Sequence, residues 1–166
     1  RKNANIKRIK NEENIYYKDI MNNIPNNNIR DITGIDNEIW IATEKGLSKY
    51  DKNTKEFTNY FNNPDNRNSL ISDDVKTLYI DDKGLLWIGN DLGICIFDRK
   101  DHFTNINEAF KINNINAEWV FDITKDKDGV MWFACGFNNG LISFNTKTKE
   151  IKKYKNIEDD DTSLSF

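Results

Sequence analysis

The sequence predicts an all-β fold made of β-propeller repeats, with about three four-stranded antiparallel blades plus part of a preceding blade in an incomplete ring. Three nearly identical phrases begin at Trp40, Trp87 and Trp132, which are 47 and 45 residues apart. Within each repeat, apolar residues alternate with polar ones, which is the period of strands and not of helices. A repeat of roughly 40 to 50 residues that holds several short strands is typical of propeller blades.

Each repeat is expected to contain four strands in the same order. The first strand is an alternating run, found at 29–32, 75–80 and 119–123. The second contains the repeated Trp, which is expected to be a wedge between adjacent sheets and not a stacking surface for a ligand. The third begins Gly-Leu or Gly-Ile and ends in an aromatic residue followed by Asp or Asn. The fourth follows a polar turn, at 57–60, 103–106 and 151–154.

Glycines mark the turns between these strands. Gly84 and Gly129 stand just before two of the Trp strands, where a hairpin turn needs a positive φ, and Asn37 takes that place in the first repeat. Another Gly follows each Trp by six residues in the first two repeats and by eight in the third. The third repeat therefore carries a two-residue insertion in this turn.

The repeat register predicts one partial propeller that spans 1–166. Its expected parts are outer strands of a preceding blade at 1–22, blades at 27–62, 68–107 and 116–156, and a lead-in to a further blade at 157–166. Because the chain is expected to begin and end inside blades, we interpret it as a piece of a longer protein. Uncovered faces and strand edges at both ends predict self-association.

Composition excludes some classes of partner. The net charge is −3 and both signs are interspersed, so there is no basic stripe for nucleic acid and no polybasic patch for a membrane surface. No apolar run approaches the roughly 20 residues that span a bilayer. We therefore expect no nucleic-acid partner and no membrane span in this chain.

The residues do not predict a catalytic or metal centre. His102 is the only histidine, so every triad or metal site that uses histidine would need it, and its place before an outer strand favours a solvated position. Cys95 and Cys135 lie in different blades, which favours free thiols. The acidic run at 158–161 lacks the spacing of a calcium loop. We predict no catalytic residue, no metal ligand and no cofactor.

The phrase at 68–98 resembles the two-component regulator propeller repeat. That repeat reads Ser-Leu, then Val or Ile, then Asp-x-x-Gly-x-Leu-Trp-Ile-Gly-Thr and Gly-Leu-x-x-Tyr-Asp. Similar phrases stand at 27–51 and 116–145, so the resemblance covers most of the chain. The chain departs from the usual Gly or Thr at four positions, Ala42, Ala134, Asn90 and Cys135.

The resemblance implies a ligand-sensing propeller segment of a bacterial two-component-type membrane receptor. Propellers of this family form extracytoplasmic sensor regions of hybrid histidine kinases, and several recognise carbohydrate fragments. The resemblance also implies that this segment is not an enzyme and that its partner is a carbohydrate or another small extracellular ligand. Any kinase or other output module is then expected beyond a membrane span outside this chain.

Two other functions remain open. The Asp-box propeller of sialidases and other glycosidases has the motif Ser-x-Asp-x-Gly-x-x-Trp, which Asp82 and Trp87 fit in part, although Ile80 replaces the Ser. One alternative is therefore a glycan-active hydrolase. The other is a scaffold for protein contacts, because propellers commonly serve that role.

A ligand site is expected on the face where the turns between second and third strands and the connectors between blades emerge. The inserted turn of the third repeat offers an aromatic ring beside two amides, which suits stacking on a sugar ring while bonding its hydroxyls. The predicted ligand-binding residues are Phe137, Asn138, Asn139, Trp119, Glu118, Glu44, Asp91 and Arg67. The alternative is that Phe137 packs on its own loop and Trp119 in the core.

Overall fold

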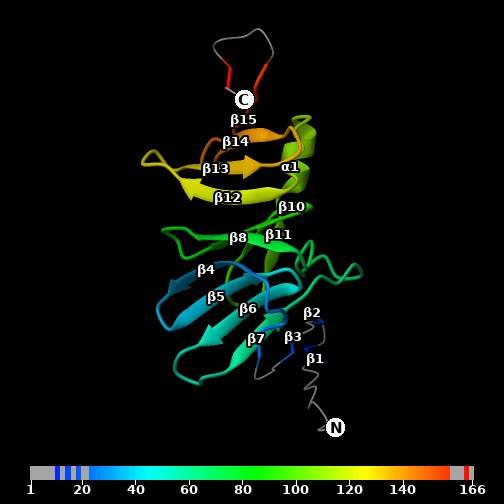
Figure 1. Cartoon of the computed structure of the whole chain (residues 1–166), viewed down its shortest axis with the longest axis vertical. Coiled ribbons are helices and arrows are strands. Elements are labelled where there is room, and N and C mark those ends of the chain that lie inside the picture. Colours follow the sequence, from blue (N-terminus) through cyan, green and yellow to red (C-terminus); the bar gives the residue numbers. More distant parts are fainter. Residues whose placement is uncertain (1–9, 12–13, 16–17, 20–22, 158–162, 165–166) are drawn as a thin grey trace.

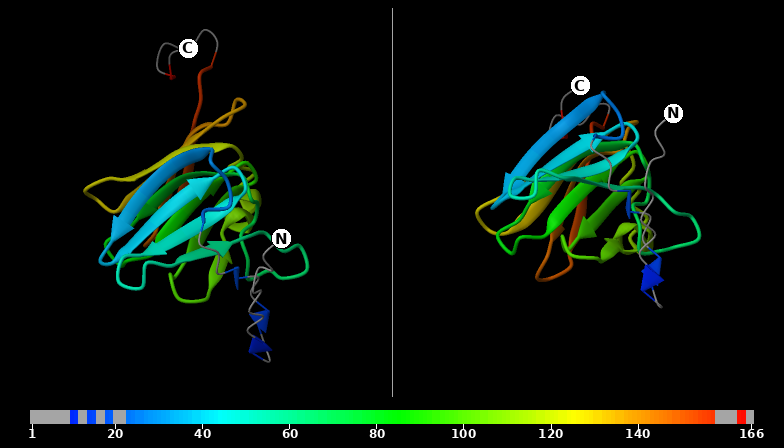
Figure 2. Two further views of the ribbon diagram at one scale, coloured as in Figure 1. Left: turned by 60° about the horizontal axis from the view of Figure 1, so that its bottom comes forward. Right: turned by 90° about the horizontal axis from the view of Figure 1, so that it is seen from below.

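A computed structural model of the chain describes residues 10–11, 14–15, 18–19, 23–157 and 163–164. Three antiparallel sheets follow one another along the molecule, each containing four consecutive strands (Figure 1). Viewed from other sides, the sheets lie face to face (Figure 2). The predicted all-β architecture of three four-stranded antiparallel blades is confirmed, and the described residues do not close a ring.

In each blade, consecutive strands are hydrogen-bonded neighbours. Blade 1 contains β4 (Ile29–Ile35), β5 (Glu38–Thr43), β6 (Gly46–Asp51) and β7 (Phe57–Tyr60). Blade 2 contains β8 (Val75–Ile80), β9 (Leu86–Asn90), β10 (Gly93–Phe97) and β11 (Phe103–Asn105). Blade 3 contains β12 (Val120–Lys125), β13 (Val130–Cys135), β14 (Gly140–Asn145) and β15 (Ile151–Tyr154). The first strands of neighbouring blades contact one another, so β4, β8 and β12 are the inner strands.

Three two-residue strands precede blade 1. β1 (Lys10–Asn11) and β2 (Asn14–Ile15) pair with each other, and β3 (Lys18–Asp19) pairs antiparallel with β7. The sequence places these residues in a preceding blade, whereas β3 is a fifth strand on the outer edge of blade 1. The other residues of 1–22, and most of the predicted lead-in at 157–166, lie outside the described residues, so the blade boundaries remain predictions.

The connector between blades 2 and 3 contains a short helix, α1 (Asn107–Ile112), which the strand pattern does not predict. One side chain explains it. Phe110 is 1% exposed and packs against Phe133 and Phe144 of blade 3, with ring centroids 6.0 and 5.9 Å away. The helix therefore helps to close the core between these two blades. No helix in the described part of the chain is both long and apolar enough to cross a membrane.

The first two repeated Trp residues fill the spaces between blades. Trp40 is fully buried, stacks on Tyr60 with ring centroids 5.7 Å apart, and meets Phe97 of blade 2 edge-on. Trp87 is 2% exposed and lies in the core between blades 2 and 3. Burial of aromatic rings of this size is a major stabilising term. The wedge role predicted for Trp40 and Trp87 is confirmed.

Trp132 has the same local environment but a different outer neighbour. It stacks on Tyr154 with ring centroids 5.6 Å apart, as Trp40 stacks on Tyr60. Trp132 is nevertheless only half-buried, because no further sheet of the described residues covers this face of blade 3. The outer face of blade 3 is thus built like the face of blade 1 that packs on blade 2.

An aspartate turn holds each of the later Trp side chains. Asp81 accepts a hydrogen bond from Trp87 Nε1 at 3.0 Å, and its other oxygen accepts backbone N–H groups of the turn. Asp126 accepts from Trp132 Nε1 at 2.8 Å in the same way. Each of these aspartates stands six residues before its Trp. The Asp-x-x-Gly-x-x-Trp phrase therefore fixes the orientation of the Trp side chain that packs between blades.

Candidate functional site

A β-bulge begins each inner strand at the same place. The strand register shifts between Ile29 and Asp31, between Val75 and Thr77, and between Val120 and Asp122. A bulge adds one residue and re-aims its side chain, and bulges are frequent beside functional sites. The bulged residues are Arg30 in blade 1, Lys76 in blade 2 and Phe121 in blade 3.

The bulges lie beside the turns that join second to third strands, because Ile29, Val75 and Val120 pair with the last residues of β5, β9 and β13. This end of the inner strands is called the inner rim. It consists of the bulged residues, the residue before each inner strand, and one residue from each turn. The members are Asn28, Arg30, Glu44, Asp74, Lys76, Asp91, Trp119, Phe121 and Phe137.

Blade 1 contributes a closed polar cluster to the inner rim. Arg30 forms an ion pair with Glu44, and Asn28 Nδ2 donates to the same carboxylate at 2.6 Å. Both oxygens of Glu44 therefore have partners within blade 1. The predicted ligand residue Glu44 lies at the rim, but its carboxylate is already bound by Arg30 and Asn28.

Blades 2 and 3 meet at Lys76. Its ammonium lies 2.9 Å from Asp74 Oδ2, 4.4 Å from the ring centroid of Trp119 and 5.8 Å from that of Phe121. The Lys76 side chain is only 7% exposed. A cation this far from water needs both a carboxylate and aromatic faces around it. Lys76 thus connects the charged part of the rim to its aromatic part.

Trp119 joins the turns of two blades. Its backbone N–H donates to Asp91 O at 2.9 Å, and its carbonyl accepts from Gly136 N at 2.9 Å. Its φ of 54° is left-handed, which is uncommon for a bulky residue. Its side chain is half-buried and belongs to neither of the two hydrophobic cores. The ring meets Phe137 edge-on, with centroids 4.7 Å apart. The alternative of a core position is therefore wrong for Trp119.

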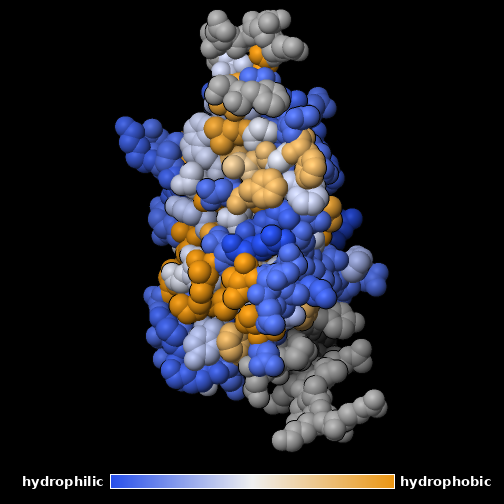
Figure 3. Space-filling model, in the orientation of Figure 1, coloured by the Kyte–Doolittle hydropathy of each residue, from blue (hydrophilic) through white to orange (hydrophobic). Residues whose placement is uncertain are grey.

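The aromatic part of the rim is open to solvent. Phe121 is 55% and Phe137 72% exposed, unusual values for phenylalanine. Figure 3 shows one hydrophobic area at the level of β4 and another at the level of β12 and β13, with a hydrophilic band between them. An apolar platform thus adjoins the charged groups of blade 2.

Two carboxylate oxygens of blade 2 have no hydrogen-bond donor among the described residues. They are Asp74 Oδ1 and Asp91 Oδ1, and both atoms are buried. Asp74 and Asp91 stand at the same end of β8 and β9. They are neighbours there because the adjacent residues, Val75 and Asn90, pair with each other in the sheet. A buried acceptor without a donor costs about 1–3 kcal/mol, so each of these oxygens destabilises this part of the rim unless a donor reaches it.

Of the eight predicted residues, the structure places four in the inner rim, Glu44, Asp91, Trp119 and Phe137, and puts Asn138 on the same turn as Phe137. Three others lie elsewhere. Asn139 is 8% exposed, and its Oδ1 accepts from Lys153 Nζ at 3.0 Å on the outer strand. Glu118 lines a separate cavity of about 290 Å³ under α1, and Arg67 lines a third space.

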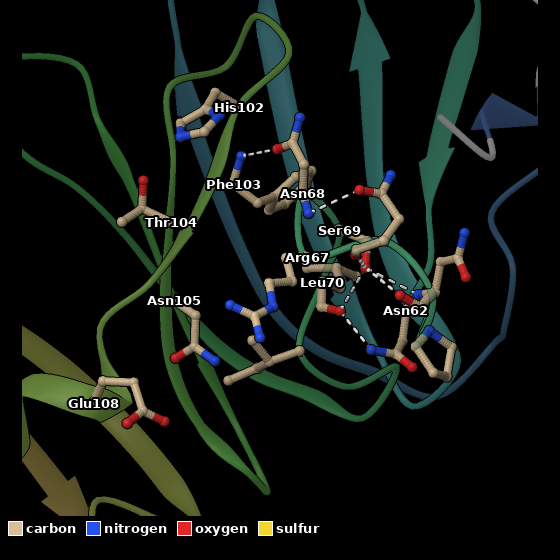
Figure 4. Close-up of a pocket in the computed structure, with 14 residues that line it drawn as sticks. Asn62, Arg67, Asn68, Ser69, Leu70, His102, Phe103, Thr104, Asn105 and Glu108 are labelled. Carbon is tan, nitrogen blue, oxygen red and sulfur yellow. Dashed lines mark hydrogen bonds between the residues drawn. The ribbon is translucent and has the colours of Figure 1, made fainter. Parts of the chain in front are cut away.

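That third space, the outer pocket, has a volume of about 870 Å³. It lies between the connector at 62–71 and strand β11, and Figure 4 shows the guanidinium of Arg67 directed into it. Asn68 closes one end, because its Oδ1 accepts from Phe103 N at 2.6 Å and its Nδ2 donates to Asp101 O at 3.0 Å. The outer pocket is therefore distinct from the inner rim.

Sequence reasoning missed five members of the inner rim: Asn28, Arg30, Asp74, Lys76 and Phe121. The usable signal was the alignment of the repeats, which places Arg30, Lys76 and Phe121 at one position of successive inner strands. The strand period alone cannot show that this position is bulged. The described residues contain no group of three His, Cys, Asp or Glu side chains that could hold a metal ion.

The profile described as two component regulator propeller matches residues 69–91 and 114–137, which include the Trp87 strand and the turn with Phe137. Histidine kinase P4 of Formosa agariphila is 33% identical over 119 residues. The match covers 69% of this chain and 8% of that protein.

Solved structures agree with this family. The extracellular domain of a hybrid two-component system from B. thetaiotaomicron has a TM-score of 0.70 and 26% identity, covering 80% of this chain and 19% of that one. A second such domain from this organism has a TM-score of 0.65 and 16% identity, covering 78% and 17%. Virginiamycin B lyase from Staphylococcus aureus, with a TM-score of 0.54, 20% identity and coverage of 77% and 41%, shares the fold alone.

The chain spans only a small part of the two-component proteins that it matches. The matched segments contain the aspartate turn, the Trp wedge and the inner-strand entrance on which the blades are built. The chain therefore carries repeats of the two-component regulator propeller family, as the sequence predicts.

Proposed function

We propose that this chain is a non-catalytic, ligand-sensing segment of a bacterial two-component-type membrane receptor and acts on the extracytoplasmic side. Its repeats belong to the regulator propeller family, and the two-component structures that it resembles are extracellular domains. A sensor segment needs a surface that recognises a ligand and a fold that transmits the change. The inner rim meets the first need.

The ligand that suits the inner rim is a neutral carbohydrate. One observation carries this assignment: the exposed aromatic platform of Phe121 and Phe137 stands beside the carboxylates of Asp74 and Asp91, each of which has one oxygen without a donor among the described residues. Sugar rings present apolar C–H faces to aromatic rings and hydroxyl donors at their edges. Pockets that combine an apolar wall with a few placed polar groups are typical of small-ligand sites.

The charges of the rim favour a neutral ligand over an anionic one. Arg30 is paired with Glu44, and Lys76 with Asp74. Asp91 forms no ion pair with any described residue. The rim therefore has no spare cation for a carboxylate or sulfate group, and an anion there would meet a like charge.

The test is a binding titration of the 166-residue chain with neutral gluco-, xylo-, arabino- and manno-oligosaccharides, beside uronic-acid oligomers of matched length. We expect saturable binding of a neutral oligomer without new reducing ends. Replacing both Phe121 and Phe137 by Ala should weaken binding about tenfold or more. The control is Ile112→Ala, since Ile112 is 82% exposed on α1 and is not a member of the rim.

Other results would contradict parts of the proposal. Binding that survives the double variant would place the ligand elsewhere. Preferential binding of the uronic-acid oligomer would overturn the neutral class but keep a sugar sensor. Turnover would favour the hydrolase alternative, against which one contact already argues: Asp81, and not the Asp-box candidate Asp82, holds Trp87, while Asp82 pairs with Lys125.

Self-association is also part of the proposal. The outer face of blade 3 presents Trp132 and Tyr154, and the outer face of blade 1 presents Ile29 and Ile32. Between neighbouring blades, equivalent groups pack on one another. A head-to-tail contact of two copies would bury both faces.

A further inference from the structure

Blades 1 and 2 differ at the outer edge of the sheet. In blade 1, β3 adds to β7, with Lys18 opposite Tyr60 and Asp19 opposite Asn59. In blade 2, the outer strand β11 has no such neighbour among the described strands, and the outer pocket runs beside it.

The repeat register shows what replaces β3 in blade 2. Asn28 and Asp74 both stand immediately before an inner strand, so Lys18–Asp19 corresponds to the residues at 64–65. There the chain forms a tight loop instead of a strand. Asn63 N donates to Ser69 Oγ at 2.9 Å, and Asn62 Nδ2 donates to Leu70 O at 2.6 Å.

Pro64 explains why this loop does not pair. Proline has no backbone N–H, so it cannot donate across a sheet edge. Asn66 N donates to Asn63 O at 2.9 Å and completes the turn. The chain thus leaves the edge of β11, and the outer pocket occupies the place that β3 takes in blade 1.

Exposure of the outer strands follows from this difference. Phe57 and Phe103 are equivalent, since each pairs with the last aromatic residue of the third strand. The next residues of β7 are buried, Thr58 at 8% and Asn59 at 0%, whereas both corresponding residues of β11 are exposed. The outer strand of blade 2 is therefore open to solvent, whereas the outer strand of blade 1 is covered by β3.

The backbone groups of Asn105 point outward. Asp98 N donates to His102 O, and Ile106 N donates to Ile94 O, so the groups at 102, 104 and 106 face β10. In an antiparallel pair the direction alternates, so 103 and 105 face away from β10. Phe103 N confirms this, because it donates to Asn68 Oδ1. Asn105 is the open position of the edge.

We propose that the edge of β11 binds an extended peptide segment, which adds to blade 2 as a fifth strand within the outer pocket. The peptide N–H and C=O opposite Asn105 pair with its backbone, as in strand addition generally. Arg67 points into the same space and forms no ion pair with any described residue, so an acidic side chain on the peptide is favoured. The partner is a polypeptide, not the sugar proposed for the inner rim.

The probe is a synthetic, end-blocked peptide with the sequence of residues 14–23, which contains the strand that covers blade 1. We expect saturable binding to the 166-residue chain and slower amide hydrogen exchange at Asn105. Asn105→Pro removes the outward N–H at an edge that tolerates proline, and should weaken binding about tenfold. Thr104→Val is the matched control, because it leaves the backbone groups unchanged.

A peptide with Asn in place of Asp19 tests the role of Arg67. Arg67→Ala should weaken the Asp peptide and leave the Asn peptide unaffected. Absence of saturable binding at millimolar peptide, or binding with unchanged exchange at Asn105, would overturn the proposal. The exchange measurement on the unmodified chain decides the question even if the proline variant fails to fold. Sugar binding at the inner rim is not expected to change in either case.

Discussion

The ammonium of Lys76 in blade 2 lies 4.4 Å from the centre of the Trp119 ring, at the entrance to blade 3. This contact crosses the boundary between two blades, and Asp74 completes it from the other side at 2.9 Å. It makes the inner rim part of the interface between blades. A ligand at Trp119 or Asp74 would therefore act on the packing of blades 2 and 3.

Lys76→Met is predicted to destabilise the fold. The change removes the cation beside Trp119 and leaves the Asp74 carboxylate without its ion-pair partner, which we expect to lower the free energy of unfolding by about 1–3 kcal/mol. Urea unfolding measures it. Lys111→Met is the control, because the Lys111 and Glu108 side chains are 68% and 76% exposed. Equal stabilities for the two variants would contradict the prediction.

Ile32→Lys is predicted to weaken self-association without unfolding the chain. Ile32, Leu78 and Ile123 occupy equivalent positions, each opposite the residue after a repeated Trp. Leu78 and Ile123 are 6% and 4% exposed in cores between blades, whereas Ile32 is 62% exposed. We expect a stability change of about 0.5 kcal/mol or less for an exposed site.

Sedimentation velocity over a range of concentrations measures this association. The unmodified chain should form larger species as concentration rises, and Ile32→Lys should remain smaller. Leu78→Lys serves as the contrast, because a lysine in that core should unfold the chain. An unmodified chain that stays folded and monomeric throughout would refute the head-to-tail contact.

Low pH is predicted to reduce the stability that the Asp126 carboxylate gives to blade 3. The hydrogen bond from Trp132, followed by those from backbone N–H groups, lowers the pKa of Asp126 below its ordinary value of 3.8. The folded state thus favours the carboxylate. Its stabilisation is fully present above the pKa of the unfolded chain and is lost as pH falls through the lower folded pKa.

Urea unfolding of the unmodified chain and of Asp126→Ala tests this from neutral pH down to about pH 2.5. The stability difference between the two should be constant near neutral pH and shrink below the ordinary carboxyl pKa. The Trp132 indole N–H resonance should shift over the same range. A difference that does not depend on pH would show that Asp126 contributes nothing through its charge.

Both cysteines are predicted to resist alkylation in the folded chain. Burial raises the pKa of the Cys95 thiol to about 12 and that of Cys135 to about 11. The thiolate is the reactive form, so iodoacetamide at pH 8 should label neither thiol until urea is added. Mass spectrometry of the labelled chain measures it. Rapid native labelling of Cys135 would mean that β13 opens beside the inserted turn.

The sequence by itself determined the blades. The alternating runs, the Gly before Trp87 and the Asp six residues before it are local features, and each favours the same turn or strand wherever the chain folds. The threefold spacing then orders the strands, because a blade buries its faces only against the next one. This is why the burial of Trp40 and Trp87 and the rim position of Trp119 and Phe137 could be predicted.

Only the tertiary structure decided which side chains meet. Nothing local separates Lys76 from a solvated lysine, and its burial depends on a bulge and on a neighbouring blade. Asn139 turns to Lys153, and Arg67 to the outer pocket, because side-chain direction follows packing and not spacing. Contacts between blades join residues far apart in sequence, and their energies depend on how whole sheets dock, which no short pattern encodes.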